Sequence, residues 1–213
     1  MRLLVIGGGG FGTYHARQLL RAGYQGRVTV VDRDPDCEAF RTLPVEAVVS
    51  EWLPFLRSWL AEAPVEDRLV PAPLAPHLLW EWLGGEVEGS VFEAPPRGWG
   101  LPYEVPGPGL ELYLSAAAWR CPATCIEPAH CPALHGPRNW DLADLIEAEA
   151  VQRGFQPAVF RCLHFAGGVG TIPVRDLVSA RDRLRAAAGG RALVATSSRC
   201  HAAVGVLRLA ANR

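Results

Sequence analysis

The chain has 213 residues, of which 49% are hydrophobic and 20% are charged. This length and composition are typical of a water-soluble protein that buries a substantial core. The 21 basic residues and 22 acidic residues give a formal net charge of −1. The chain therefore lacks the basic field that attracts nucleic acid, and we expect neither DNA nor RNA as a partner.

The amino-terminal residues and the cysteine content indicate where in the cell the protein is located. The apolar run after Met1 is interrupted by glycines and is too short for a signal peptide. No apolar stretch of the sequence approaches the length of a membrane-spanning helix. We therefore expect a cytoplasmic protein, in which the six cysteines serve as metal ligands or free thiols rather than as disulfides.

The first 32 residues predict a nucleotide-binding unit. An apolar strand over residues 3–6 leads into the glycine-rich residues 7–12. A helix follows and ends at Gly23, and a second apolar strand over residues 28–31 leads to Asp32. This succession of strand, glycine turn, helix, strand and acidic residue satisfies the dinucleotide-binding fingerprint.

Each part of this fingerprint has a physical role. Gly7 permits a tight turn, Gly9 lets the backbone approach a pyrophosphate, and Gly12 lets the helix pack closely on the strand. Asp32 is placed to accept hydrogen bonds from a ribose diol and to repel a 2′-phosphate, which favours NAD over NADP, with FAD a less favoured cofactor. The alternative is a plain turn whose site is empty. The residues expected to bind the cofactor are Gly7, Gly8, Gly9, Gly10, Phe11, Gly12, Asp32 and Arg33.

Two stretches of this region carry a family resemblance. Residues 7–12, followed by Val-Val-Asp-Arg-Asp-Pro at residues 30–35, resemble the nucleotide-binding domains of potassium-conductance regulators. They also resemble the amino-terminal halves of saccharopine dehydrogenase-like oxidoreductases. The resemblance covers only about the first forty residues. It implies a Rossmann fold and a bound nucleotide, and it does not select an activity.

Strands and helices continue to alternate after the fingerprint. An apolar, β-branched run over residues 45–49 is typical of a buried parallel strand, and residues 68–70 are expected to form a fourth strand. Between them, leucine and tryptophan residues over 52–60 have helical spacing. A helix over 77–83 follows. This alternation predicts a doubly wound, mostly parallel Rossmann-like sheet.

The remainder of the chain is expected to continue the same sheet as a second half, residues 119–213, after a dinucleotide-binding half over residues 1–118. Residues 84–108 are rich in glycine and proline and are expected to form a surface excursion. The further expected elements are a strand over 110–118, a helix over 140–153 capped by Asn139, a strand over 158–165, a helix over 173–188, and strands over 192–196 and 203–209 that form an antiparallel hairpin at the sheet edge.

A cysteine-rich loop follows the strand expected over 110–118. Cys121, Cys125 and Cys131 fall within eleven residues of a proline-rich segment, and such a segment brings thiolates together with few amides to neutralise them. The loop therefore predicts a bound cation. Cys200 is the first choice for a fourth ligand and Cys162 the second, because both lie near expected strand ends.

Three interpretations of this loop stay open. An iron–sulfur cluster suits a set of thiolates beside a nucleotide, although the spacing matches no common ferredoxin pattern. A structural zinc ion suits the same residues, although zinc sites usually space each cysteine pair more tightly. The third interpretation is a set of unligated thiols, of which Cys37 is the plainest example.

Three further features have both a functional and a structural interpretation. His77 follows the strand expected over 68–70 and is the one weak candidate for a catalytic acid or base, although a structural helix cap is the commoner role. Residues 167–171 form either a second anion cradle or a simple turn. Glu127 is either a proton carrier or a solvated loop carboxylate.

Two functions from different classes remain. The first is an NAD-dependent oxidoreductase that pairs the dinucleotide with the cysteine-bound cluster or metal and acts on a small-molecule substrate or an electron-transfer partner. The second is a nucleotide or redox sensor with a structural zinc site, as the resemblance to conductance regulators implies. A homo-oligomer is compatible with both. No convincing catalytic acid–base pair is visible in the sequence, so both functions stay open.

Overall fold

The computed structural model describes residues 1–71, 77–122 and 125–211. The chain divides into two compact units. The first unit contains Met1–Ala75 and Leu163–Val178, and the second contains Pro76–Cys162 and Ser179–Arg213. Residues 76–118, expected in the first half, thus belong to the second unit.

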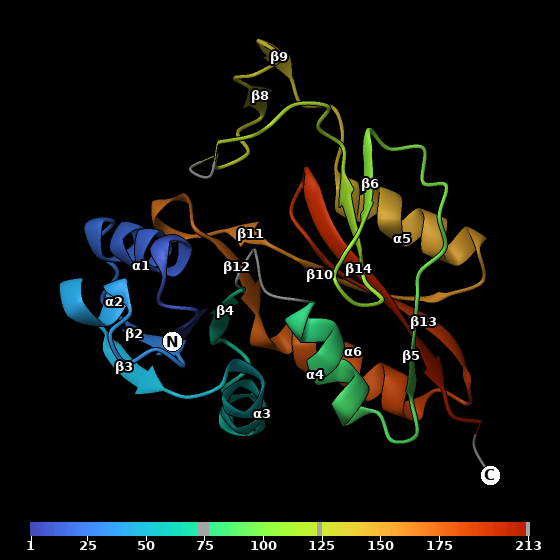
Figure 1. Cartoon of the computed structure of the whole chain (residues 1–213), viewed down its shortest axis with the longest axis horizontal. Helices are drawn as coiled ribbons and strands as arrows, with labels where there is room; N and C mark the ends of the chain where they lie inside the picture. Colours follow the sequence, from blue (N-terminus) through green and yellow to red (C-terminus); the bar gives the residue numbers. More distant parts are fainter. Residues whose placement is uncertain (72–76, 123–124, 212–213) are drawn as a thin grey trace. The chain divides into compact units, whose positions relative to one another are not determined.

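The first unit is built on a six-stranded sheet (Figure 1). Its strand order is β11-β12-β4-β1-β2-β3. β4, β1, β2 and β3 are parallel neighbours, whereas β12 is antiparallel to β4 and β11 is antiparallel to β12. The strands are β1 (Arg2–Ile6), β2 (Arg27–Asp32), β3 (Glu46–Val49), β4 (Arg68–Val70), β11 (Leu163–His164) and β12 (Gly170–Pro173).

Helices join the parallel strands of this sheet. Leu3, Val5 and Val30 are fully buried in the core of the unit, together with Ala16 and Leu19 of α1. A strand with no exposed apolar side chain is the pattern of a parallel strand covered on both faces. The helices of the first unit are α1 (Gly10–Arg21), α2 (Glu38–Thr42), α3 (Trp52–Glu62) and the 3-10 turn η1 (Ala166–Gly168), and α6 (Val174–Ala186) begins in it.

The second unit has a separate six-stranded sheet with the order β10-β13-β14-β7-β6 and with β5 paired to β14 beside β7. Among the described residues of this unit's six-stranded sheet, β10 and β13 pair in parallel and the other pairs are antiparallel. The strands are β5 (Val91–Glu93), β6 (Tyr103–Pro106), β7 (Leu112–Ser115), β10 (Gln156–Arg161), β13 (Gly190–Ser197) and β14 (His201–Leu209). Its helices are α4 (Leu78–Glu86) and α5 (Leu142–Gln152), and a small hairpin pairs β8 (His130–Cys131) with β9 (Gly136–Pro137).

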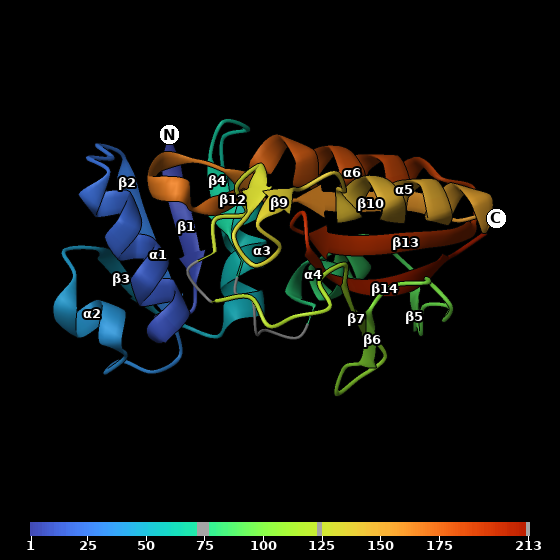
Figure 2. The ribbon, with the colours of Figure 1, turned by 90° about the horizontal axis from the view of Figure 1, so that it is seen from above.

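Successive residues of β13 and β14 point alternately to the two faces of this sheet, and helices cover both faces. Leu193 and Val206 pack in one cluster with Leu142 and Ile146 of α5, and Figure 2 shows α5 running along β10 and β13. On β14, Gly205 alternates with these inward residues, and a Cβ built on Gly205 would lie 2.4 Å from the ring of Trp80 in α4. Because successive strand residues point to opposite faces, α5 and α4 cover opposite faces of the sheet.

The expectation of a single doubly wound, mostly parallel sheet is wrong. The chain forms two sheets that mix parallel and antiparallel pairs. The carboxyl-terminal strands do form an antiparallel hairpin, β13 and β14, but this hairpin lies in the middle of its sheet. The hairpin is internal because further strands are added beyond β14. Two of them, β5 and β6, form within the glycine- and proline-rich residues 84–108, which were expected to be a surface excursion. β5 and β7 pair with the free edge of β14 and so cover it.

No helix in the described part of the chain is long and apolar enough to cross a lipid bilayer.

Candidate functional site

The glycine turn after β1 is shaped by two glycines that no other residue can replace. Gly7 has a φ of +85° and donates its amide to Val31 O at 2.8 Å. A Cβ at Gly12 would lie 1.7 Å from the carbonyl oxygen of Gly7. Gly7 therefore makes the turn, and Gly12 allows α1 to pack against it.

Two other glycines of the turn leave open space. A Cβ on Gly9 or Gly10 would meet no atom within 4 Å in the described residues, and both glycines are exposed. Gly9 is the N-cap of α1, no side chain of the described residues caps this helix, and its first turn holds no acidic residue. Unpaired amides at a helix N-terminus bind anions through their partial positive charge.

Asp32 lies at the end of β2 beside this turn. One carboxylate oxygen accepts the amide of Gly8 at 2.6 Å, and the other accepts the amide of Asp34 at 2.9 Å. Asp32 is only 8% exposed. Because each carboxylate oxygen has two acceptor positions, Asp32 keeps capacity for a further donor. Of the other predicted cofactor ligands, Phe11 and Arg33 are exposed beside the turn and beside Asp32 in the sequence.

The side chains of Cys37 and Trp52 pack against the buried glycines of this turn. The Cys37 thiol is packed against Gly8, where a Cβ would lie 2.3 Å from the sulfur. Burial raises the pKa of Cys37, and the charge of Asp32 raises it further, so the sulfur is a neutral thiol at neutral pH. The Trp52 ring lies 3.3 Å from the Cβ position of Gly7, and its buried indole N–H has no partner among the described residues.

His77 is enclosed in the second unit. It is 3% exposed, and its Nε2 lies 3.0 Å from Val194 O, so Nε2 carries the proton and donates. Burial lowers its pKa to about 4, although the bond to Val194 favours the charged form. His77 precedes α4 as its N-cap but makes no capping bond with its side chain. Its environment is that of a neutral core histidine.

The glycines near residue 167 form a packed turn. A Cβ on Gly167 would lie 2.5 Å from Gln18 O of α1. Thr171 is fully buried and accepts a hydrogen bond from Arg68 Nε at 2.6 Å. The hydroxyl expected to face an anion is therefore occupied by protein contacts.

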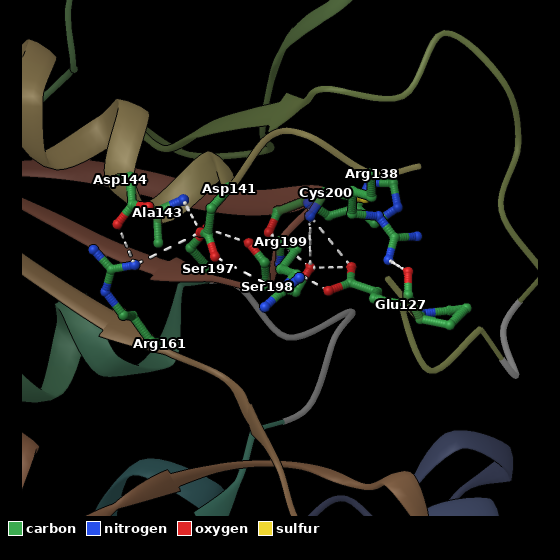
Figure 3. A network of polar contacts seen from close by, with 12 residues as sticks. Glu127, Arg138, Asp141, Ala143, Asp144, Arg161, Ser197, Ser198, Arg199 and Cys200 are labelled. Carbon is green, nitrogen blue, oxygen red and sulfur yellow. Dashed lines mark hydrogen bonds and ion pairs between the residues drawn. The ribbon is translucent and has the colours of Figure 1, made fainter. Parts of the chain in front are cut away.

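The cysteine segment is held in place by Glu127 (Figure 3). The Glu127 carboxylate accepts the Ser198 hydroxyl at 2.6 Å, the Arg199 amide at 2.7 Å and the Cys200 amide at 3.3 Å. Glu127 has a φ of +49°, a left-handed conformation that costs a non-glycine residue about 1–3 kcal/mol. These bonds fasten the cysteine segment to the turn between β13 and β14, about seventy residues away in the sequence.

The turn between β13 and β14 also contacts the N-terminus of α5. Asp141 is the N-cap of α5 and accepts the Ala143 amide at 3.0 Å, whereas the sequence suggested Asn139 as the cap. Arg161 forms an ion pair with Asp144 at 2.7 Å (Figure 3). It forms a second ion pair with Glu147, also at 2.7 Å. The Leu142 amide donates to Arg199 O at 3.0 Å, so the turn that carries Cys200 is bound from both sides.

Three of the four predicted metal ligands come from the cysteine segment, and the fourth is Cys200. Burial raises the pKa of Cys121, and the charges of Cys125 and Cys131 raise it further. Burial likewise raises the pKa of Cys200, and Cys121 contributes to that shift. The described residues contain no group of three or more His, Cys, Asp or Glu side chains arranged to hold a metal ion.

The remaining cysteines lie elsewhere. Loss of hydration raises the pKa of Cys162 to about 12, Glu127 adds to the shift, and its amide donates to Ser197 O. None of the other cysteines contributes to that shift. The bonds of Glu127 place the backbone of Cys200 beside the cysteine segment, whereas the Cys162 amide bonds to Ser197 of β13.

Arg138 is a residue of this region that sequence reasoning missed. It is 8% exposed, it donates to Pro128 O, and its Nε has no partner in the described part of the chain. Burial lowers the pKa of Arg138, but the negative charges of Cys200, Glu127, Cys131 and Cys125 outweigh burial and raise it. The signal in the sequence was weak: Arg138 lies seven residues after Cys131 and two residues before Trp140.

Part of the chain matches a known family. A family described as AF_1314_C, uncharacterized protein, C-terminal domain, matches residues 75–210. No curated protein and no solved structure matches the chain.

Proposed function

We propose that this chain, which belongs to the AF_1314_C family, binds NAD at the glycine turn of its first unit and acts as an oxidoreductase. The observation that carries the proposal is the open space in front of Gly9 and Gly10 at the N-terminus of α1. This space lies directly at the first turn of α1, which no side chain of the described residues caps, whereas the neighbouring Gly8 is packed by Cys37.

The pyrophosphate of the dinucleotide would lie in this open space. Gly9 and Gly10 have no side chain to keep it at a distance, and the first amides of α1 would donate to its oxygens. The parallel strands β3, β2, β1 and β4 place the turn at the carboxyl edge of the sheet, between β1 and its neighbours on either side. Ligands of open α/β sheets bind at this edge.

The adenosine ribose would be held by Asp32. Its carboxylate is oriented by the amides of Gly8 and Asp34 and has acceptor positions left for a diol. The same charge would repel a 2′-phosphate, which supports NAD over NADP. Arg33, next in the chain, is exposed and is available to the outer face of the adenosine.

The bound nucleotide would supply hydride transfer, either to a small-molecule substrate or toward an electron-transfer partner. The chain's own contribution on this proposal is to bind and orient the nucleotide. All six cysteines, every one of them described, are free thiols, which supports a cytoplasmic location for this chemistry.

A second candidate function is a nucleotide or redox sensor. One observation favours it: His77, the acid–base candidate, is enclosed in the core of the second unit with a pKa of about 4. An enclosed, neutral histidine cannot exchange a proton with a substrate in the manner of a general acid or base.

Calorimetric titration of the purified chain with NAD, NADH and NADP tests the binding step. We expect NAD or NADH to bind in a one-to-one ratio and more tightly than NADP. Tighter binding of NADP, or no binding of any of the three, would overturn the proposal. Turnover of NADH with added electron acceptors then separates the enzyme from the sensor, because the sensor binds without consuming NADH.

A further inference from the structure

The sheet of the first unit contains one complete half of a dinucleotide-binding sheet. A sheet of that kind consists of two halves of three parallel strands, and each half holds one mononucleotide. Here β3, β2 and β1 form the half that leads into the glycine turn. On the other side of β1, β4 continues the parallel direction with three residues. The second half is therefore incomplete in the described part of this unit.

The strand next to β4 runs in the opposite direction. β12 is antiparallel to β4, with Ile172 opposite Leu69, and β11 is antiparallel to β12. The helix after β12, α6, begins at Val174, whose amide donates to the carbonyl oxygen of Asp67, the residue before β4. The N-terminus of α6 therefore lies at the edge of the sheet where β4 begins, opposite to the edge that holds the glycine turn. It offers no second set of helix amides to a ligand bound at the turn.

The polar groups suited to a nucleotide lie on the β2 and β3 side of the turn. Asp32 ends β2 and accepts the Gly8 amide, and the Ser50 amide, the first after β3, donates to the carbonyl oxygen of Asp32 at 3.0 Å. Two residues further, the Trp52 ring lies 3.3 Å from the Cβ position of Gly7, and its buried indole N–H has no partner among the described residues. An acceptor and a spare donor thus lie on the side of the turn where the dinucleotide fingerprint holds adenosine.

The carboxyl end of β4 has a different character. Leu69 is fully buried, Val70 is buried as well, and Pro71, the next residue, has no amide hydrogen to donate. Residues 69–71, the last described residues of this stretch, carry no polar side chain. The described end of β4 therefore provides neither a donor nor an acceptor side chain on the side where a dinucleotide-binding sheet holds its second nucleotide.

From this asymmetry we infer that the first unit recognises the adenosine 5′-diphosphate moiety of its ligand and leaves the group attached to the second phosphate unrecognised. The inference rests on the nucleotide binding proposed above, and it specifies which part of the nucleotide supplies the affinity. The ligand class is then the derivatives of adenosine 5′-diphosphate with a free ribose diol, which include ADP, ADP-ribose and NAD. Nicotinamide mononucleotide lacks the adenosine half and lies outside this class.

Calorimetric titration of the whole chain with NAD, NADH, ADP-ribose and nicotinamide mononucleotide tests the inference. ADP-ribose is NAD without its nicotinamide, so it keeps every group that the first unit is inferred to recognise. We expect NAD, NADH and ADP-ribose to bind with dissociation constants within about fivefold of one another. Nicotinamide mononucleotide should not bind at concentrations at which NAD saturates the chain.

The outcomes separate this inference from the proposed function. An affinity for NAD more than about fivefold above that for ADP-ribose, or binding of nicotinamide mononucleotide that NAD displaces, would overturn the inference alone. Absence of binding by NAD, NADH and ADP-ribose alike would overturn nucleotide binding at the turn and the inference with it. Binding of ADP-ribose without binding of NAD would support the inference and overturn NAD as the ligand.

Amide hydrogen exchange locates the contacts on the unaltered chain and so does not depend on the folding of a variant. With NAD or ADP-ribose bound, exchange should slow in peptides that cover residues 7–12 and 30–34, and to the same extent for both ligands. Peptides that cover residues 174–178, at the opposite edge of the sheet, serve as the internal control and should not change. Slower exchange in residues 68–70 with NAD but not with ADP-ribose would place the nicotinamide half at β4 and overturn the inference.

Discussion

Asp32 accepts a hydrogen bond from the amide of Gly8 at 2.6 Å. The carboxylate that we propose as a ribose ligand is therefore also a structural part of the glycine turn. Its second oxygen accepts the Asp34 amide, so the acidic residue at the end of β2 fixes the turns on both sides of it. Loss of this carboxylate is expected to change both the stability and the ligand affinity of the first unit.

Replacement of Asp32 by alanine should weaken NAD binding by about 1–3 kcal/mol, the cost of removing a charged hydrogen-bond partner. The melting temperature should fall as well, because the amides of Gly8 and Asp34 lose their acceptor. Calorimetry and thermal melting measure the two effects. D36A is the control, since Asp36 is exposed. An NAD affinity of D32A equal to that of the control would rule out Asp32 as a ribose ligand.

Two glycine substitutions should separate binding from folding. Gly9→Ala places a methyl group in open space at a φ of −74°, so the fold should stay intact or gain up to about 1 kcal/mol of stability. The same methyl group, and more so the side chain of G9V, should weaken NAD binding because it fills the space of the pyrophosphate. Gly12→Ala should destabilise the first unit instead, since its Cβ would strike Gly7 O. Unchanged NAD affinity in G9V would mean that the glycine run is only a turn.

The pH dependence of stability should report the enclosed His77. Its pKa is about 4 in the folded chain against 6.5 for an ordinary histidine. Between these values the unfolded chain binds a proton that the folded chain does not, so the free energy of unfolding falls as the pH drops from 6.5 to 4. The contribution is fully present above pH 6.5 and amounts to about 3 kcal/mol.

The variant H77Q isolates this contribution. The glutamine amide can still donate to Val194 O but does not titrate. Denaturant unfolding at several pH values should therefore show a smaller loss between pH 6.5 and 4 in H77Q than in the unaltered chain. His15 and His201, whose pKa values burial also lowers, leave a remaining slope in both proteins. Identical slopes would mean that His77 is not buried in the neutral form.

Replacement of Glu127 by glutamine should loosen the cysteine segment. The glutamine retains one acceptor oxygen where the carboxylate accepts from Ser198, Arg199 and Cys200. We expect a loss of about 1–2 kcal/mol of stability in the second unit and a weaker hold on any bound metal. Thermal melting and metal analysis measure these effects, with E88Q as the exposed control. Equal melting and equal metal content in both variants would show that Glu127 does not position Cys200.

The sequence predicted the local elements of the first unit well. α1 follows the glycine turn and is terminated by Gly23, whose φ is +72°. α6 covers residues 174–186 within the span expected over 173–188. These features follow from short-range chemistry, namely a backbone conformation open to glycine and the spacing of apolar residues along one helix face.

The partners of the strands were not predictable in the same way. An apolar run identifies a strand without saying which strand it pairs with or in which direction, so residues 84–108 were expected to be irregular although β5 and β6 form there. The position of the hairpin β13 and β14 in the middle of the second sheet depends on those two strands and on β7.

The sequence by itself determined the glycine turn with Asp32 and grouped Cys121, Cys125 and Cys131, because each set lies within a short stretch of chain whose geometry is local. Only the tertiary structure decided that the turn carrying Cys200 lies against the cysteine segment and that Arg138 is buried. The physical reason is the Glu127 carboxylate, which satisfies the amides of a turn about seventy residues away. A contact of that separation depends on how the two segments fold together, and no spacing in the sequence encodes it.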